Sequence, residues 1–147
     1  MKPLFVLVAV FAVALLLNRP GGNTPDLRTA GNIGMAAMLL FTSLGHFLFT
    51  DGMSRMLPSY VPLKRGLVWL TGGLEIIAAA GLLFPATRWA TAMCLIAFFL
   101  LTLPANIYAA LHHVDYQHPD KRGPGPRYLW FRVPLQLFFI GWVYYFS

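Results

Sequence analysis

Glu75 is the residue whose type and position in this sequence most suggest chemistry. It lies in "TGGLEIIAAAGLLFP", an apolar run over residues 71–85 that is hydrophobic enough to lie in a membrane. An unpaired carboxylate at the centre of a membrane helix costs about 2.5–3.5 kcal/mol on insertion scales. Such a group is retained where it pairs with another side chain, exchanges a proton or orients the polar part of a ligand.

Four further polar side chains fall in other apolar segments, in the same inner half of the membrane as Glu75. They are His46, Asn106, Arg132 and Gln136, and their depth is counted along each helix from the expected inner end of its segment. Glu75 lies about 15 Å deep at the helical rise. Arg132 and Gln136 are four residues apart and therefore share one helix face. We expect Arg132 to pair with Glu75, and the other three side chains to complete a polar pocket.

This pocket has two interpretations. In the first, it binds the polar head of a small amphipathic molecule, and Glu75 or His46 passes a proton in a catalytic version. In the second, the ion pair only fixes the register of the helices, since buried pairs also specify packing. Asn106 and Gln136 by themselves are more typical of hydrogen bonds between helices than of ligand binding. Whether a reaction is catalysed stays open.

Two prolines lie close to the same polar residues. Pro104, in "LTLPANIYAA", leaves the carbonyl of Leu100 without its usual N–H partner, and Pro134, in "FRVPLQL", does the same for Trp130. Freed carbonyls are tolerated inside a membrane where neighbouring groups or waters satisfy them. Two interrupted helices beside buried polar groups therefore predict a cavity.

The elements that must position these residues are five apolar segments. They cover residues 3–17, 30–50, 66–84, 87–111 and 127–146. Hydrophobic residues make up 58% of the chain, against about 45–50% in soluble domains. The later four segments are each long enough to cross a hydrocarbon core of about 30 Å. The predicted fold class is an all-α membrane protein, with a four-helix transmembrane bundle plus an N-terminal fifth transmembrane helix.

The first segment is short enough to be the apolar region of a signal peptide, because Lys2 gives it a basic start. However, "LLLNRPGGNTP" offers no A-x-A-like cleavage site, so we expect this segment to stay as a helix. Residues 1–29 are then an N-terminal transmembrane helix with an external loop, and residues 30–147 are the four-helix domain.

The basic residues between the segments predict the orientation. The net charge of +6 is spread over loops and not along one helix face, so it indicates topology and not nucleic-acid binding. If the first helix starts inside, the outer segments carry only Arg19, Arg28 and Arg88. The inner segments carry Lys2, Arg55, Lys64, Arg65, Lys121, Arg122 and Arg127. This bias predicts a multi-pass protein of the bacterial inner membrane, with a cytoplasmic N-terminus and an external C-terminus.

No metal or cofactor is expected. One loop holds five residues able to bind a metal, but their spacing matches no established site: His112, His113, Asp115, His118 and Asp120. A haem held by two histidines is not expected, because it needs a second intramembrane histidine and the apolar segments contain only one. No nucleotide-binding fingerprint is present in the sequence. The single cysteine, Cys94, is expected to be a buried core residue.

Four phrases in order carry a family resemblance, from about residue 31 to the C-terminus. They are "SLGHF", "GGLEIIAAAGLLFP", "PANIYAA" and "RVPLQLFFIGWVY". Together they resemble the DoxX-like integral membrane proteins, in particular a bacterial subgroup with no assigned activity. The resemblance implies a small four-helix membrane bundle, linked in some members to quinone-associated redox work and often to partner proteins. This sequence departs from the pattern by its N-terminal helix and carries no redox cofactor signature.

Two functions follow as hypotheses. The leading one is a membrane protein whose buried pocket, with Glu75 and Arg132 at its centre, binds a small amphipathic molecule such as a quinone or an isoprenoid lipid. The alternative is a non-catalytic membrane subunit that anchors or assembles a redox or maturation complex, in which the polar cluster is structural. A protein partner or a homo-oligomer is compatible with both. A transporter is disfavoured, because five helices without repeat symmetry suit alternating access poorly.

Overall fold

All regular elements of the described chain are helical. The structure, a computed structural model, describes residues 2–17, 26–118 and 121–147, and no strand occurs in these ranges. One isolated bridge joins Val114 and Arg122. The elements, in chain order, are α1 (Lys2–Leu17), α2 (Leu27–Leu48), α3 (Thr50–Ser54), α4 (Lys64–Leu83), α5 (Pro85–Leu111), the 3₁₀ helix η1 (Pro126–Tyr128) and α6 (Leu129–Phe146).

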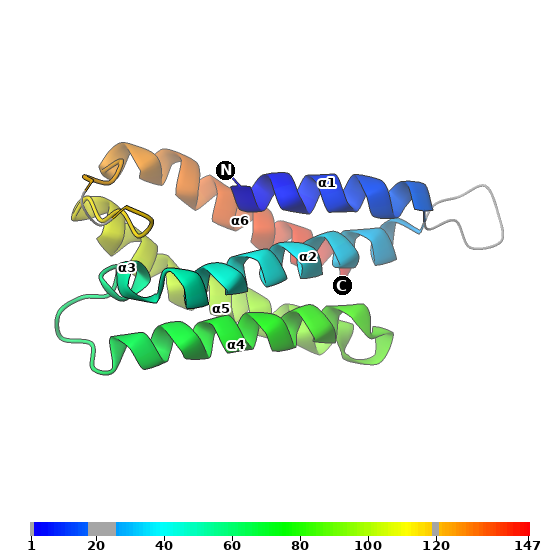
Figure 1. Cartoon of the computed structure of the whole chain (residues 1–147). Helices are drawn as coiled ribbons and strands as arrows, with labels where there is room; N and C mark the ends of the chain where they lie inside the picture. Colours follow the sequence, from blue (N-terminus) through cyan, green and yellow to red (C-terminus); the bar gives the residue numbers. More distant parts are fainter. Residues whose placement is uncertain (1, 18–25, 119–120) are drawn as a thin grey trace.

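Four long helices pack in a closed order around a shared interior. α2 contacts α4, α4 contacts α5, α5 contacts α6, and α6 returns to α2. α1 packs on the outside of α2 and lies along the bundle (Figure 1). The all-α prediction is therefore confirmed.

The structure supports fewer membrane spans than the sequence predicts. Within the described ranges, three helices are long and apolar enough to cross a membrane, α2, α4 and α5. α1 is apolar but has only 16 residues. α6 has 18 residues and carries Arg132 and Gln136. Spanning by all five helices therefore stays a prediction.

Local chemistry explains where the helices begin. The side chain of Asp26 accepts a hydrogen bond of 3.1 Å from the backbone N–H of Thr29, so Asp26 caps α2. α5 begins at Pro85, because proline at the first helical position needs no N–H partner. Both helices begin two or three residues earlier than the apolar pattern predicts. Pro104 and Pro134 each lie inside a helix, as the sequence predicts.

The apolar core fills the half of the bundle that contains the α4–α5 turn. Its largest buried members include Leu7, Met35, Leu39, Leu82 and Val143. At this end the start of α2 and the end of α6 are joined by polar contacts. Asn32 Nδ2 donates to the carbonyl of Phe146 over 2.6 Å, and Trp142 Nε1 donates to the carbonyl of Gly31 over 3.0 Å. A Cβ at Gly31 would collide with the Phe146 ring, so glycine permits this close approach.

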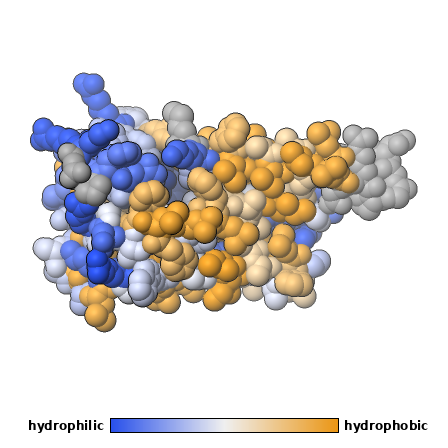
Figure 2. All heavy atoms as spheres, viewed as in Figure 1, coloured by the Kyte–Doolittle hydropathy of each residue, from blue (hydrophilic) through white to orange (hydrophobic). Residues whose placement is uncertain are grey.

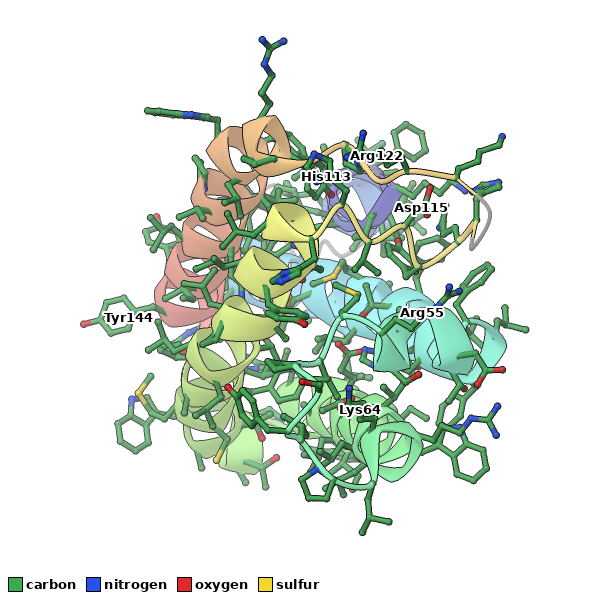
Figure 3. All side chains as sticks on the ribbon, turned by 90° about the vertical axis from the view of Figure 1, so that its left-hand side faces the viewer. Arg55, Lys64, His113, Asp115, Arg122 and Tyr144 are labelled. Atoms are coloured by element: carbon green, nitrogen blue, oxygen red, sulfur yellow. The ribbon has the colours of Figure 1, made fainter. Side chains whose placement is uncertain are left out.

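The surface is divided between a hydrophobic belt and a hydrophilic end. Figure 2 shows apolar residues around the middle of the molecule and hydrophilic ones gathered at the end where α3 lies. Figure 3 looks onto that end, where Arg55, Lys64, Asp115 and Arg122 lie.

Cys94 faces outward from α5 and is exposed, so the prediction that it is a core residue is wrong. Position 94 lies on the α5 face opposite the buried Ala92, Leu95 and Phe99. The hydrophobic belt, onto which Cys94 faces, suits contact with lipid.

Candidate functional site

Eight polar side chains lie at one level of the bundle, and we call them the polar layer. They are Thr42, His46, Thr71, Glu75, Thr102, Asn106, Arg132 and Gln136. Direct contacts join α2 to α4 and α5 to α6 within the layer. α2 and α6 are antiparallel, and Asn32 touches Phe146. Moving ten residues along each helix from that contact brings Thr42 level with Gln136.

Glu75 is held between α2 and α4. It is 6% exposed, and its Oε2 accepts a hydrogen bond of 2.9 Å from Thr42 Oγ1. Its Oε1 lies 3.6 Å from His46 Nε2, within the range of an ion pair but beyond a normal hydrogen bond. Gly72 lets the two helices approach here, because a Cβ at that position would lie 2.8 Å from the Cβ of His46. Glu75 and His46 are therefore direct neighbours.

The other side of the His46 ring faces acceptors. Nδ1 lies 3.1 Å from the carbonyl of Val68 and 3.1 Å from Thr71 Oγ1. Thr71 Oγ1 in turn donates to the same carbonyl over 2.9 Å. A carbonyl oxygen can only accept, so these contacts suit the tautomer with a hydrogen on Nδ1, which Thr71 would receive through its oxygen. This fixes the orientation of the ring and leaves Nε2 turned toward Glu75.

The predicted ion pair between Glu75 and Arg132 is wrong. Among the described residues the carboxylate of Glu75 meets His46 and Thr42, and no ion pair joins it to Arg132. Arg132 Nη2 instead donates to Asn106 Oδ1 over 3.3 Å. The sequence places both charged groups in the same inner half of the membrane but does not give their rotation about the helix axes. That rotation turns Glu75 toward α2 and Arg132 toward α5.

A second network joins α5 and α6 through amides. Asn106 Nδ2 donates to Gln136 Oε1 over 3.4 Å, beside its contact with Arg132. Gln136 is 5% exposed, and its Nε2 donates to the carbonyl of Phe99 and, over 3.3 Å, to Thr102 Oγ1. The five predicted site residues thus share one level but form two separate networks.

The prolines act differently from the prediction. Gln136 donates to the carbonyl of Phe99. The neighbouring carbonyl of Leu100, which Pro104 leaves without its N–H partner, receives no side-chain hydrogen bond from the described residues. Pro134 lines a shallow apolar hollow of about 430 Å³ between α1 and α6. Its other lining residues are Leu4, Trp130, Phe131, Leu135 and Phe138. This hollow faces α1 and not the polar layer, so the predicted polar cavity is not found at that position.

The loop between α5 and α6 is a folded connection. Gly123 N–H donates to the carbonyl of His113 over 2.8 Å, and Asp115 Oδ1 accepts from the backbone N–H groups of Gln117 and His118. Burial raises the pKa of the Tyr116 hydroxyl. No group of three metal-binding side chains occurs among the residues that were placed, and Asp120 lies outside them.

Sequence reasoning missed the three threonines of the polar layer. Thr42, Thr71 and Thr102 each precede a predicted site residue by four positions. Residues four apart share a helix face, so every bundle helix contributes one polar pair to the same layer. A search for polar pairs at this spacing in all four segments would have found them.

Comparison with known families gives one match. The sequence model of a family described as "Domain of unknown function (DUF8561)" matches residues 35–147. This span contains the whole polar layer and covers well over half of the chain. Searches of the curated proteins and of the solved structures found no match.

Proposed function

For this chain, which belongs to the family described as Domain of unknown function (DUF8561), we propose a function from the contacts of its polar layer. The protein would be a multi-pass membrane protein that binds the polar head of a small amphipathic molecule at Glu75 and His46. A quinone or an isoprenoid lipid is the class of ligand we propose. The observation that carries this proposal is a buried carboxylate facing an imidazole whose other nitrogen is already engaged.

Partial exposure of the pair supports ligand access. The side chain of His46 keeps 18% of its surface exposed, against 8% for Glu75. A ligand head would therefore approach from the imidazole side. The pair lies on helices that are long and apolar enough to cross a membrane, where an ionisable residue is by default a candidate for function. Asn106, Arg132 and Gln136 lie at the same level and form a second set of polar contacts.

The topology remains part of the proposal. All five long helices would cross the bacterial inner membrane, with the N-terminus in the cytoplasm and the C-terminus outside. The bias of seven basic residues in inner segments against three in outer ones supports this orientation. The resemblance to DoxX-like proteins stays a prediction, and it is the reason to include quinones among the ligands.

Native mass spectrometry of the gently extracted protein tests ligand binding. We expect a defined small molecule on the wild type and its loss from a folded Glu75→Gln variant. Asp51→Asn is the matched control, because Asp51 is an exposed carboxylate paired with Arg65 at the hydrophilic end. A ligand equally present on all three forms, or only bulk lipid on each, would contradict the proposal.

One observation favours the alternative of a non-catalytic anchoring subunit. Within the described residues, no buried side-chain nitrogen or oxygen lacks a hydrogen-bond partner. A polar layer that satisfies itself needs no ligand. In that case Glu75→Gln would reduce the yield of folded protein, no small molecule would be found, and a protein partner would co-purify with the wild type.

A further inference from the structure

We infer that the Glu75–His46 pair selects a ligand head that carries a hydroxyl group, such as a quinol or an isoprenoid alcohol. This inference rests on the proposed function and narrows it. The two atoms that would meet this head group are Oε1 of Glu75 and Nε2 of His46, which lie 3.6 Å apart.

The contacts around the pair suit one arrangement of hydrogens. A hydrogen on His46 Nδ1 points to the carbonyl of Val68. With that hydrogen alone, Nε2 and Oε1 would be two acceptors facing each other over 3.6 Å inside the bundle. No lysine or arginine among the described residues pairs with this carboxylate, and leaving a buried charge unpaired is expensive. A pair that holds one further proton, on Oε1 or on Nε2, avoids this.

That proton gives the pair one donor and one acceptor. Thr42 Oγ1 lies 2.9 Å from Oε2 and within 3.2 Å of the carbonyls of Met38 and Leu39. When its one hydrogen points to Oε2, a proton on Glu75 is on Oε1. If the proton is there, Oε1 donates and Nε2 accepts. If it is on His46, Nε2 donates and Oε1 accepts. In both states the two facing atoms offer opposite hydrogen-bonding roles.

One oxygen atom beside the pair could bridge these two atoms. A separation of 3.6 Å is too long for a direct hydrogen bond. An oxygen atom can lie about 2.8 Å from both atoms at once, which is the usual length of such bonds. The bridging group must accept from one side and donate to the other.

A hydroxyl group meets this requirement, whereas a head group that only accepts does not. A quinone carbonyl or an ether oxygen only accepts, which leaves one side of the pair without a partner. A phosphate would bring a negative charge to the Glu75 carboxyl. The basic group nearest in level, Arg132 on α6, points toward Asn106 on α5. The polar layer thus contains a separate position, at Arg132, that would suit an anion. Preferred binding of an anionic head group there is the outcome that would contradict the hydroxyl preference.

Three probes with the same apolar chain test the head group. Farnesol both donates and accepts, farnesyl methyl ether only accepts, and farnesyl phosphate is an anion. Each would be titrated in native mass spectrometry against the detergent-solubilised protein. We expect farnesol to bind about tenfold more tightly than the ether, the effect of one unsatisfied hydrogen bond. We expect the phosphate to bind no better than the ether.

Variants identify the atoms involved. Glu75→Gln and His46→Gln should each remove the preference for farnesol over the ether. His112→Gln is the matched control for histidine, because His112 is exposed and stacked on Tyr108. Asp51→Asn is the control for the carboxylate. Both controls should keep the tenfold preference.

The outcomes separate this inference from the proposed function. Equal binding of farnesol and ether that Glu75→Gln abolishes would overturn the hydroxyl preference and keep the binding site. Preferred binding of the phosphate, lost in Arg132→Gln, would overturn the preference and move the head group to α6. If no probe binds, while the wild type still carries an endogenous ligand sensitive to Glu75→Gln, the inference fails and the proposed function stands. If no probe binds and the wild type carries no such endogenous ligand, both the inference and the proposed function fail.

Discussion

The two networks of the polar layer lie at one level of the bundle and have different chemistry. Between α2 and α4, a carboxylate and an imidazole stand 3.6 Å apart, within the range of an ion pair. Between α5 and α6, amides and a guanidinium form a chain of donors and acceptors that ends on the backbone of Phe99. The two facing atoms of the first network are too far apart for a direct hydrogen bond, whereas the second network is joined by direct hydrogen bonds. Side chains at equal depth in a bundle therefore differ in chemistry.

The α2–α4 network depends on the closeness of its helices, and separating them should give the largest effect. A Cβ at Gly72 would lie 2.8 Å from His46 Cβ, whereas no atom lies within 4 Å of one at Gly73. We expect Gly72→Val to destabilise the protein by about 3 kcal/mol, the upper range for an overpacked contact. Gly73→Val should leave thermal stability in detergent unchanged. Equal behaviour of the two variants would mean that α2 and α4 are not in close contact there.

The α5–α6 network should respond in stability but not in ligand binding. Gln136→Leu removes contacts to Asn106, Thr102 and the Phe99 carbonyl, and we expect a loss of about 1.5 kcal/mol. Thermal unfolding measures this loss, and native mass spectrometry measures the bound ligand. Leu137→Ala, on the exposed face of α6, is the control. Loss of the ligand from folded Gln136→Leu protein would show that the networks work together.

A double-mutant cycle tests which partner Glu75 has. We expect Glu75→Gln and His46→Gln to be coupled by about 1 kcal/mol, as for residues in direct contact. Glu75→Gln and Arg132→Gln should be additive, because they belong to different networks. A larger coupling energy for the second pair would restore the ion pair that the sequence predicts.

The smallest effect is expected at the start of α2, far from both networks. Hydrogen bonding from the side chain and then from the backbone of Thr29 lowers the pKa of Asp26. A lowered pKa in the folded state means that this stabilisation is present above the ordinary pKa of about 3.9 and is lost as the pH falls through the lowered value. Asp26→Ala should cost about 0.5 kcal/mol at neutral pH, the low end for a helix cap. Asp26→Asn should keep the cap and abolish this pH dependence, which unfolding at several pH values would show.

The sequence predicts much of the fold because apolar blocks and prolines act locally. The blocks indicate every long helix, and Pro85 and Asp26 explain why two of them begin earlier than the apolar pattern. The exposure of Cys94 was not predictable in this way. An apolar residue in a membrane helix can face lipid as well as the core, and hydropathy does not distinguish the two sides.

The sequence predicts that the five polar residues lie near one level of the bundle, but it does not predict their pairing. Depth follows from counting along a helix, and all five residues lie in the polar layer. Whether this layer is a functional site stays a prediction. Pairing depends on the rotation of each helix, which the predicted partners Glu75 and Arg132 illustrate. The i, i+4 threonines carry part of that missing information. Thr42 and Thr71 mark the faces of α2 and α4 that meet.

The unequal lengths of α1 and α5 have a consequence for the surrounding bilayer. At 1.5 Å per residue, the 16 residues of α1 rise about 24 Å and the 27 residues of α5 rise about 40 Å. The helices lie on different flanks of the bundle, since α1 packs on α2 while α5 packs on α4 and α6. If both helices cross a membrane of about 30 Å, that membrane is too thick for the first flank and too thin for the second. The lipid would then thin beside α1, and α5 would tilt or extend beyond the hydrocarbon core. This hydrophobic mismatch would make membrane thickness a condition that affects the protein's stability and its location.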